Sequence, residues 1–348
     1  PRSTPKPSSA ASDVYKRQLK VLLITNRRIA PLMEHYDGLV CGVDSAPARM
    51  LITSAHRLGK PTFQVIISLL VKKRKEEKTL KSRIKHKLKL WLARFTGMNF
   101  LALPTGVAKS GCDRIFVMGE RVRRVLIQNG VPEERILVYG VPRFKRLYKL
   151  ATPSSSCCIS DESINILYIP GAFAAHGETK QHRLQQCQLK KIVEYILKSD
   201  PNRYRLIVKI HPREREEYYT WMKEYEKIVQ ILERNTDVYQ AILDSHMVVT
   251  ICSTVSYEAV LLNRPVIIAR FPDPEALSYE PLVSDFRTVD SVQELMKTIA
   301  SVCSDPVLYN KLLKEESKFV YDVIDPKTPK SASLIAQQIC ADIGVSLL

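Results

Sequence analysis

The sequence predicts an α/β protein with two Rossmann-like domains, each built around a parallel sheet. Three observations support this fold class. Short apolar runs alternate with amphipathic segments from Leu19 onwards, a Ser-rich stretch interrupts them at residues 150–163, and the alternation then restarts. Strands that alternate with helices form parallel sheets with helices on both faces. A chain of 348 residues is also long enough for two domains with separate cores.

Residues 1–18 are left out of this prediction. They are rich in Pro and Ser and contain no apolar segment of the kind that a signal peptide requires. Residues 9–18, SAASDVYKRQ, resemble translated sequencing-adapter read-through. We therefore expect a non-native or disordered tail, a native N-terminus that lies outside this sequence, and an N-terminal domain that is truncated.

Residues 19–149 are predicted to form this partial N-terminal domain. Its apolar runs and amphipathic segments alternate regularly, and Gly59 and Gly130 stand where glycine ends a helix. The expected strands lie at 19–26, 38–43, 61–70, 113–119 and 135–140, and the expected helices at 27–36, 46–59 and 120–130.

Residues 150–163 are predicted to be a linker and residues 164–348 a second Rossmann-like domain, the two domains facing a cleft. The expected strands of the second domain lie at 164–171, 204–210, 247–251 and 264–270. Its expected helices lie at 181–198, 214–234, 255–262, 291–302, 306–322 and 331–342.

A basic helical insertion at residues 72–95 explains much of the net charge of +17. Between residues 72 and 94 there are eleven Lys and Arg against two Glu, a balance of +9. Apolar residues recur there at helical spacing, which is typical of a helix that lies on an anionic membrane surface. A solvated helix that packs on the N-terminal domain is the alternative. Nucleic-acid binding is disfavoured because interleaved aromatic residues are missing. The candidate membrane-contact residues are Lys81, Lys85, Trp91 and Phe95.

Cysteine usage predicts a cytoplasmic protein, and the basic segment 72–95 predicts that it lies at the inner face of the membrane. The eight cysteines show no C-x-x-C spacing, so we expect reduced thiols and neither a disulfide framework nor a zinc site. No apolar run approaches the roughly 20 residues that span a bilayer.

The stretch YRLIVKIHPREREEY, residues 204–218, contains the first candidate functional residue. An apolar strand ends there on Lys209, Ile210, His211 and Pro212. Ligands of open α/β sheets bind at the carboxyl ends of strands, and proline stops the strand at that point. His211 is therefore a candidate catalytic residue, while a loop histidine with only a local hydrogen bond is the alternative.

The second candidate stretch is VVTICSTVSYEAVLLNRPVII, residues 248–268. A buried strand ends at Ile251, and Ser253 or Thr254 is expected to cap the helix that follows. The free amides of a helix start bind phosphate. Glu258 lies one turn further on, where its carboxylate suits the hydroxyls of a ribose. The alternative is a core helix whose acid pairs with Arg264 or Arg270.

If the strand that ends at His211 and the strand that ends before Ser253 are neighbours, these groups converge on one ligand.

The motifs of several other chemistries are missing from the sequence. There is no D-x-D sequence for a metal-clamped donor, no G-x-x-x-x-G-K-[ST] phosphate loop and no G-x-G-x-x-G dinucleotide motif. We therefore expect no cofactor and no metal site.

These motifs carry a resemblance. KIHPRE, followed about forty residues later by STVSYEAVLLNRPVI and preceded by VMGERVRRVLIQNGVPEERILVYGVPRF, resembles the GT-B superfamily over about residues 110–340. More narrowly, it resembles bacterial surface and capsular polysaccharide enzymes: sialyl- and Kdo-transferases, CDP-glycerol glycerophosphotransferases and UDP-N-acetylglucosamine 2-epimerases.

The resemblance implies a donor nucleotide bound to the second domain. His211 would contact the donor phosphate, and Ser253 and Thr254 would hold it at the helix start. Glu258 would bind the ribose. Gly171 would lie in the loop nearest the reacting sugar, and Lys209 and Arg213 would add positive charge around the leaving group.

The predicted function is a metal-independent, GT-B-type glycosyltransferase of surface or capsular polysaccharide biosynthesis, with a nucleotide-sugar donor and a glycan or lipid-linked glycan acceptor. A 2-epimerase or a CDP-glycerol-type polyol-phosphate transferase is the first alternative. The epimerases usually carry Gly-Gly where this chain has CSTVS. A non-catalytic basic protein that binds membrane or nucleic acid is the second. The catalytic base is unassigned: His56, Asp44 and Glu34 are available, and no motif distinguishes them.

Overall fold

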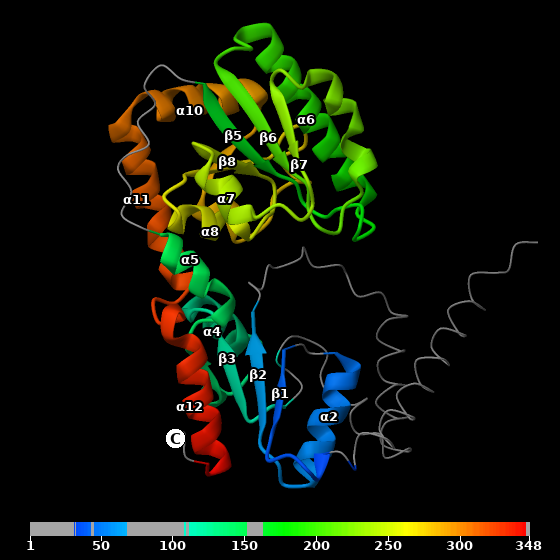
Figure 1. The fold of residues 1–348 in the computed structure, drawn as a ribbon, viewed down its shortest axis with the longest axis vertical. Helices are drawn as coiled ribbons and strands as arrows, with labels where there is room; N and C mark the ends of the chain where they lie inside the picture. Colours follow the sequence, from blue (N-terminus) through cyan, green and yellow to red (C-terminus); the bar gives the residue numbers. More distant parts are fainter. Residues whose placement is uncertain are drawn as a thin grey trace, which may run out of the picture. The chain divides into compact units, whose positions relative to one another are not determined.

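The computed structural model of the chain describes residues 31, 33–42, 45–67, 108, 111–151 and 163–345 (Figure 1). These residues form two compact units. Unit 1 contains the described residues up to Arg143 together with those from Asp325 onwards, and unit 2 contains those between Phe144 and Ile324. The predicted tail at 1–18, the strand at 19–26, the basic insertion at 72–95 and most of the linker lie outside the described residues.

Unit 1 is a parallel sheet with the order β1-β2-β3-β4 among the described strands. The strands are β1 (Leu39–Cys41), β2 (Thr62–Ile66), β3 (Arg114–Val117) and β4 (Ile136–Val138). The helical segments are α2 (Ala46–Arg57), α4 (Glu120–Gln128), η2 (Glu133–Arg135), η3 (Pro142–Phe144), η5 (Thr328–Lys330) and α12 (Ser331–Ile343). Gly59 and Gly130 have φ of +66° and +82°, the left-handed conformation expected of glycines that end helices.

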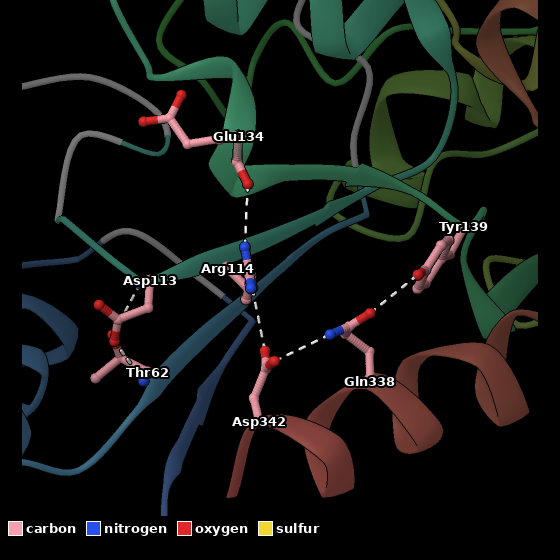
Figure 2. A network of polar contacts seen from close by, with 7 residues as sticks. All are labelled: Thr62, Asp113, Arg114, Glu134, Tyr139, Gln338 and Asp342. Carbon is pink, nitrogen blue, oxygen red and sulfur yellow. Dashed lines mark hydrogen bonds and ion pairs between the residues drawn. The ribbon is translucent and has the colours of Figure 1, made fainter.

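The C-terminal helix α12 packs on the sheet of unit 1. Ile335 joins Phe63 and Phe116 in one buried cluster. The Arg114 guanidinium bonds to the Asp342 carboxylate at 3.1 Å, and the Tyr139 hydroxyl donates to Gln338 Oε1 at 3.2 Å (Figure 2). The predicted second domain included all residues to 348, whereas the structure groups α12 with the N-terminal unit.

Unit 2 is a six-stranded parallel sheet with the order β10-β9-β8-β5-β6-β7. The strands are β5 (Ile164–Ile169), β6 (Tyr204–Lys209), β7 (Val229–Leu232), β8 (Met247–Thr250), β9 (Val266–Ala269) and β10 (Arg287–Val289). The helical segments are α5 (Lys145–Leu150), α6 (Thr179–Ser199), η4 (Glu216–Tyr225), α7 (Val238–Leu243), α8 (Val255–Leu261), α9 (Leu282–Asp285), α10 (Val292–Ser304) and α11 (Pro306–Val323).

Alternate residues of these strands build the main core of unit 2. Ile164, Ile166 and Tyr168 of β5 cluster with buried residues of α6 and α10, which also contact each other. Helix α8 contacts α5, α7 and α11. Successive side chains of a strand point to opposite faces of the sheet. One set therefore packs against α6 and α10, and the other set lies on the opposite face.

The predicted helix at residues 214–234 is wrong. A 3₁₀ segment, η4, ends at Tyr225, and β7 then pairs with β6 from Val229 to Leu232. Charged and apolar residues alternate in 214–234 at a spacing that also fits a helix. Residues 229–232 form a strand because they pair with β6. The three-residue strand β10 was not predicted either, because so short a run gives no periodicity.

None of the described helices is both long enough and apolar enough to cross a bilayer.

Candidate functional site

The strand order of unit 2 places a ligand-binding position beside β5. The chain runs outward from β5 through β6 to β7, then returns to β8 and continues in the other direction through β9 to β10. This is the doubly wound order, in which ligands bind outside the carboxyl ends of the strands where the order reverses. The reversal lies between β5 and β8, and the predicted segments around Gly171 and Ser253 follow those two strands.

The condition that the strands before His211 and Ser253 be neighbours is not met. His211 follows β6, Ser253 follows β8, and β5 lies between these two strands. All three strands are parallel, so their carboxyl ends share one edge of the sheet. The loop after β5 therefore lies between the two predicted segments.

Gly171 lies directly against the turn that follows β8. A Cβ atom added at Gly171 would come within 2.9 Å of Cys252 Sγ, so this approach requires glycine. Gln185 of α6 accepts a hydrogen bond from Gly171 N at 2.7 Å. The Thr250 hydroxyl donates to Ile169 O at 2.7 Å and joins the ends of β8 and β5. The structure thus brings the predicted Gly171 and Ser253 segments together.

His211 is half-buried and held in one orientation. Its Nδ1 accepts a hydrogen bond from Arg213 N at 3.1 Å, so the proton of the neutral ring is on Nε2. Burial is the largest cause that lowers the pKa of His211, and the positive charges of Arg213, His176 and Lys209 lower it further. The neutral imidazole is favoured, and its Nε2–H can donate a hydrogen bond to a phosphate oxygen.

The loop after β5 is attached to the turn that carries His211. Glu214 is 1% exposed, and its Oε1 accepts hydrogen bonds from Ala174 N at 3.0 Å and Ala175 N at 3.4 Å. Sequence reasoning missed both Glu214 and His176, whose charge reaches His211. The sequence contained one signal for His176. It lies in GAFAAHGET, the segment that follows a predicted strand and begins with the predicted site residue Gly171.

The side chain of Lys209, predicted to add positive charge around the leaving group, is bound to backbone carbonyls. Its side chain is 5% exposed, and its Nζ donates to Ile210 O at 3.1 Å and Arg234 O at 2.8 Å. Burial lowers the pKa of Lys209. The ammonium group therefore joins the ends of β6 and β7 and influences His211 only through its charge. Arg213, in contrast, is exposed.

Ser253 and Thr254 lie at the start of α8, as predicted. Thr254 occupies the N-cap position and is exposed, but the side chain that bonds to the helix start is that of Ser253, whose Oγ accepts from Val255 N at 3.3 Å.

Glu258 is buried on the same helix, with 2% of its surface exposed. The two arginines considered as its partners bind elsewhere: Arg264 to backbone carbonyls and Arg270 to Asp290. Neither forms the alternative ion pair with Glu258.

Of the three N-terminal candidates for a base, His56 lies in a polar cluster of unit 1. Its Nε2 is 2.9 Å from Thr62 Oγ1 and 3.2 Å from Asp113 Oδ2. The Thr62 hydroxyl also donates to Asp113 at 2.7 Å (Figure 2). Thr62 begins β2 and Asp113 precedes β3, so this cluster lies at the amino edge of the sheet, opposite the edge where ligands bind. Glu34 is exposed, and Asp44 lies outside the described residues.

A comparison with protein families matches most of unit 2 and, in unit 1, residues 119–143. Residues 119–305 match the family of CDP-glycerol:poly(glycerophosphate) glycerophosphotransferases, and this match spans more than half of the 348 residues. The chain belongs to this family. The matched region of this glycerophosphotransferase-family chain contains all seven residues predicted to bind or activate the donor: Gly171, Lys209, His211, Arg213, Ser253, Thr254 and Glu258.

Solved structures share its fold. A variant of the wall teichoic acid polymerase TagF, soaked with CDPG, is 12% identical and superposes with a TM-score of 0.51 over 98% of this chain and 99% of that chain. MnaA of S. aureus with UDP is 13% identical, with a TM-score of 0.55 over 94% and 82%. UDP-GlcNAc 2-epimerase of Neisseria meningitidis, bound to UDP-GlcNAc, is 16% identical, with a TM-score of 0.51 over 93% and 82%. A comparison with curated proteins gave no match.

The predicted α/β, GT-B-type fold is confirmed, as is the resemblance to surface-polymer enzymes. The glycerophosphotransferase family also supports the predicted transferase function with a nucleotide-activated donor in cell-surface polymer biosynthesis.

Proposed function

We propose that this chain transfers glycerophosphate, or a related polyol phosphate, from a CDP-activated donor to a hydroxyl group of a surface polymer. The observation that supports this most directly is the position of His211. It presents an Nε2–H at the carboxyl edge of β6, within the region that matches the glycerophosphotransferase family. This edge is where a doubly wound sheet binds nucleotides.

The chemistry needs help at the leaving group. The acceptor hydroxyl oxygen forms a bond to the β-phosphorus of the donor, and the bond from that phosphorus to the bridging oxygen breaks. CMP departs with the electron pair, and the hydroxyl proton passes to a base. Negative charge grows on the departing phosphate, where an aimed hydrogen-bond donor and nearby cations stabilise it. His211 supplies the donor, and Arg213 supplies exposed positive charge.

The other predicted residues have roles in the same complex. The backbone around Gly171 lies next to the turn of Ser253 and Thr254, so a phosphate at this edge meets both segments. Glu258, one turn further along α8, is assigned to the ribose hydroxyls. Since only 2% of its surface is exposed, this contact requires the donor to open the structure around it. Lys209 contributes through its charge. We propose that no metal or cofactor is required, because these groups provide the charge stabilisation.

Transfer of a sugar from a nucleotide-sugar donor is the second candidate function. It would make the chain a glycosyltransferase in the strict sense, acting on capsular or other surface polysaccharide. The group that departs is again a nucleotide phosphate, so the same residues serve both reactions. The two functions differ in the donor they accept.

A donor panel tests the proposal. We expect CDP and CDP-glycerol to raise the melting temperature of the full chain, and CDP-glycerol to release CMP in the presence of a glycerophosphate-primed acceptor. EDTA should change neither result. Binding of UDP-sugars in place of CDP-glycerol would support the second candidate. If no cytidine or uridine nucleotide binds in calorimetry, both candidate functions are wrong.

We also propose that the protein works at the cytoplasmic face of the membrane, where a lipid-linked acceptor lies. The basic segment 72–95 supports this, since cations with apolar neighbours bind anionic bilayers. The full chain should sediment with vesicles of phosphatidylglycerol and phosphatidylcholine but not with phosphatidylcholine alone. Exchanging Lys81 and Lys85 for Glu, or Trp91 and Phe95 for Ser, should reduce this binding. Unchanged sedimentation in both double variants would contradict it.

A further inference from the structure

The loop after β5 forms a fixed turn that exposes a second histidine. His176 N donates to Ala172 O and Phe173 O, both at 3.2 Å, and Glu178 N donates to Phe173 O at 2.8 Å. Gly177 has φ of +74°, a left-handed conformation that glycine adopts without strain. The side chain of His176 is exposed at the top of this turn.

Glu214 holds this turn against the turn that carries His211. Its buried carboxylate accepts hydrogen bonds from the two backbone amides just before His176, those of Ala174 and Ala175. Its own N–H donates to His211 O at 2.9 Å. Hydrogen bonds from amides to a carboxylate are stronger than neutral ones, so the Glu214 side chain fixes the His176 turn, while the Glu214 backbone N–H joins the same residue to the His211 turn.

The two histidines lie within electrostatic range. After burial and Arg213, the charge of His176 is the next cause that lowers the pKa of His211, followed by Lys209. All of these groups lower the pKa of His211, and none raises it.

The buried carboxylate of Glu214 is directed at the amides of the His176 turn. Glu178 acts instead on Cys252 and Tyr279, whose pKa values are raised by burial and also by its charge. The positive charge immediately around His211 is one that an anion would compensate.

We propose that His176 is a second phosphate-binding residue of the donor site, held beside His211 by Glu214 so that both imidazoles contact the donor diphosphate. This inference rests on the proposed function, because it assigns two ligands to the diphosphate of the same donor. Glu214 is a positioning residue that acts through the two turns. A bound diphosphate stabilises the protonated imidazoles, so binding takes up protons from solution.

Calorimetry with CDP, inorganic pyrophosphate and cytidine tests the assignment on the full chain. His176→Gln should weaken CDP and pyrophosphate by about tenfold, the loss of one hydrogen bond to a charged group, and should leave cytidine unchanged. His176 is exposed, so this variant should fold. Arg205→Gln is the matched control, because it removes an exposed charge from the opposite end of β6 and should change no affinity.

The positioning role of Glu214 has a readout without ligand. In NMR titrations of the free protein, His176→Gln should raise the pKa of His211 towards its ordinary value. Glu214→Ala should do the same and should also weaken pyrophosphate. Glu214→Gln keeps an oxygen acceptor for the two amides and should preserve most of the affinity. If Glu214→Ala fails to fold, the glutamine and His176→Gln variants still decide the matter.

The outcomes separate this inference from the proposed function. CDP and pyrophosphate affinities that are unchanged in His176→Gln would overturn the inference and leave the proposed function standing. A wild-type protein that binds no nucleotide and no pyrophosphate would overturn both. Two results for His176→Gln would support the inference. Diphosphate binding should be weaker while cytidine binding is unchanged, and proton uptake on binding, measured by comparing buffers of different ionisation enthalpy, should be smaller than in the wild type.

Discussion

At the scale of single residues, His211 combines a fixed tautomer with a lowered pKa. The Arg213 amide occupies Nδ1, while burial and neighbouring cations disfavour the charged ring. A neutral imidazole with its proton on Nε2 stabilises developing negative charge as a hydrogen-bond donor before it acts as an acid. This distinction can be measured, because glutamine places an amide N–H near the position of Nε2, and alanine places nothing there.

We therefore predict that His211→Ala lowers the transfer rate by roughly 10²–10⁴, the range expected for an acid or a charge stabiliser. His211→Gln should retain more activity than the alanine variant, because it keeps a donor at the position of Nε2. Rates of CMP release from CDP-glycerol, with urea unfolding as a check on folding, measure both effects. Equal losses in the two variants would indicate that proton transfer, not hydrogen bonding, is the main role of His211.

Sequence reasoning selected residues of this candidate site for identifiable reasons. His211 and Gly171 stand where apolar runs end on proline or glycine, and such ends are visible in a single sequence. Glu214 and His176 were missed because their importance depends on contact between two loops about 40 residues apart. Lys209 was placed in the site by its proximity in sequence to His211, but its side chain turns to backbone carbonyls that only the folded chain brings near.

At the scale of elements, the cluster of His56, Thr62 and Asp113 joins α2, β2 and β3 at the amino edge of unit 1. Burial raises the pKa of Asp113, but hydrogen bonds from the Thr62 side chain and backbone, and the charge and hydrogen bond of His56, lower it by more. A lowered pKa means that the ionised carboxylate stabilises the folded state. That stabilisation is present above the ordinary pKa of 3.8 and is lost as the pH falls through the lowered value.

We predict that Asp113→Asn makes the free energy of unfolding less dependent on pH below about 4, where the wild-type chain loses this contribution. It should also reduce stability at neutral pH and leave CDP affinity unchanged. Urea unfolding between pH 3 and 7 measures the first two effects and calorimetry the third. Asp37, an exposed residue of unit 1, provides a matched Asp→Asn control. Identical pH profiles of the wild type and Asp113→Asn would contradict the prediction.

Among elements, strand β7 shows the limit of periodicity. Residues 214–234 contain charged and apolar residues at a spacing that fits a helix, and the structure instead forms η4 and then an edge strand. Val229–Leu232 pair with the edge of β6, and the backbone hydrogen bonds of this pairing outweigh the helical preference of the segment. Longer strands with neighbours on both sides, such as β5, were predicted correctly because their apolar runs are continuous.

At the scale of the whole molecule, helix α12 changes where the chain should be divided. Its amphipathic pattern predicts that it packs against something, but not against which sheet. Ile335 is buried with Phe63 and Phe116, and Ile339 and Ile343 pack against the same cluster. In unit 2, Leu147 of α5 is buried and the Tyr148 hydroxyl bonds to Ile324 O at 3.3 Å. The second unit therefore extends from Phe144 to Ile324.

This division yields a prediction about nucleotide binding. All seven predicted donor residues, with His176 and Glu214, lie in unit 2, so a fragment of residues 144–324 should bind CDP with an affinity close to that of the full chain. A fragment of residues 164–348 lacks α5 and exposes the apolar face of α12, so it should unfold at lower temperature and aggregate. Calorimetry and light scattering on both fragments measure these outcomes. If the 144–324 fragment is folded by circular dichroism but binds CDP at least tenfold more weakly than the full chain, residues of unit 1 contribute to nucleotide binding, and the assignment of the donor site to unit 2 alone is wrong.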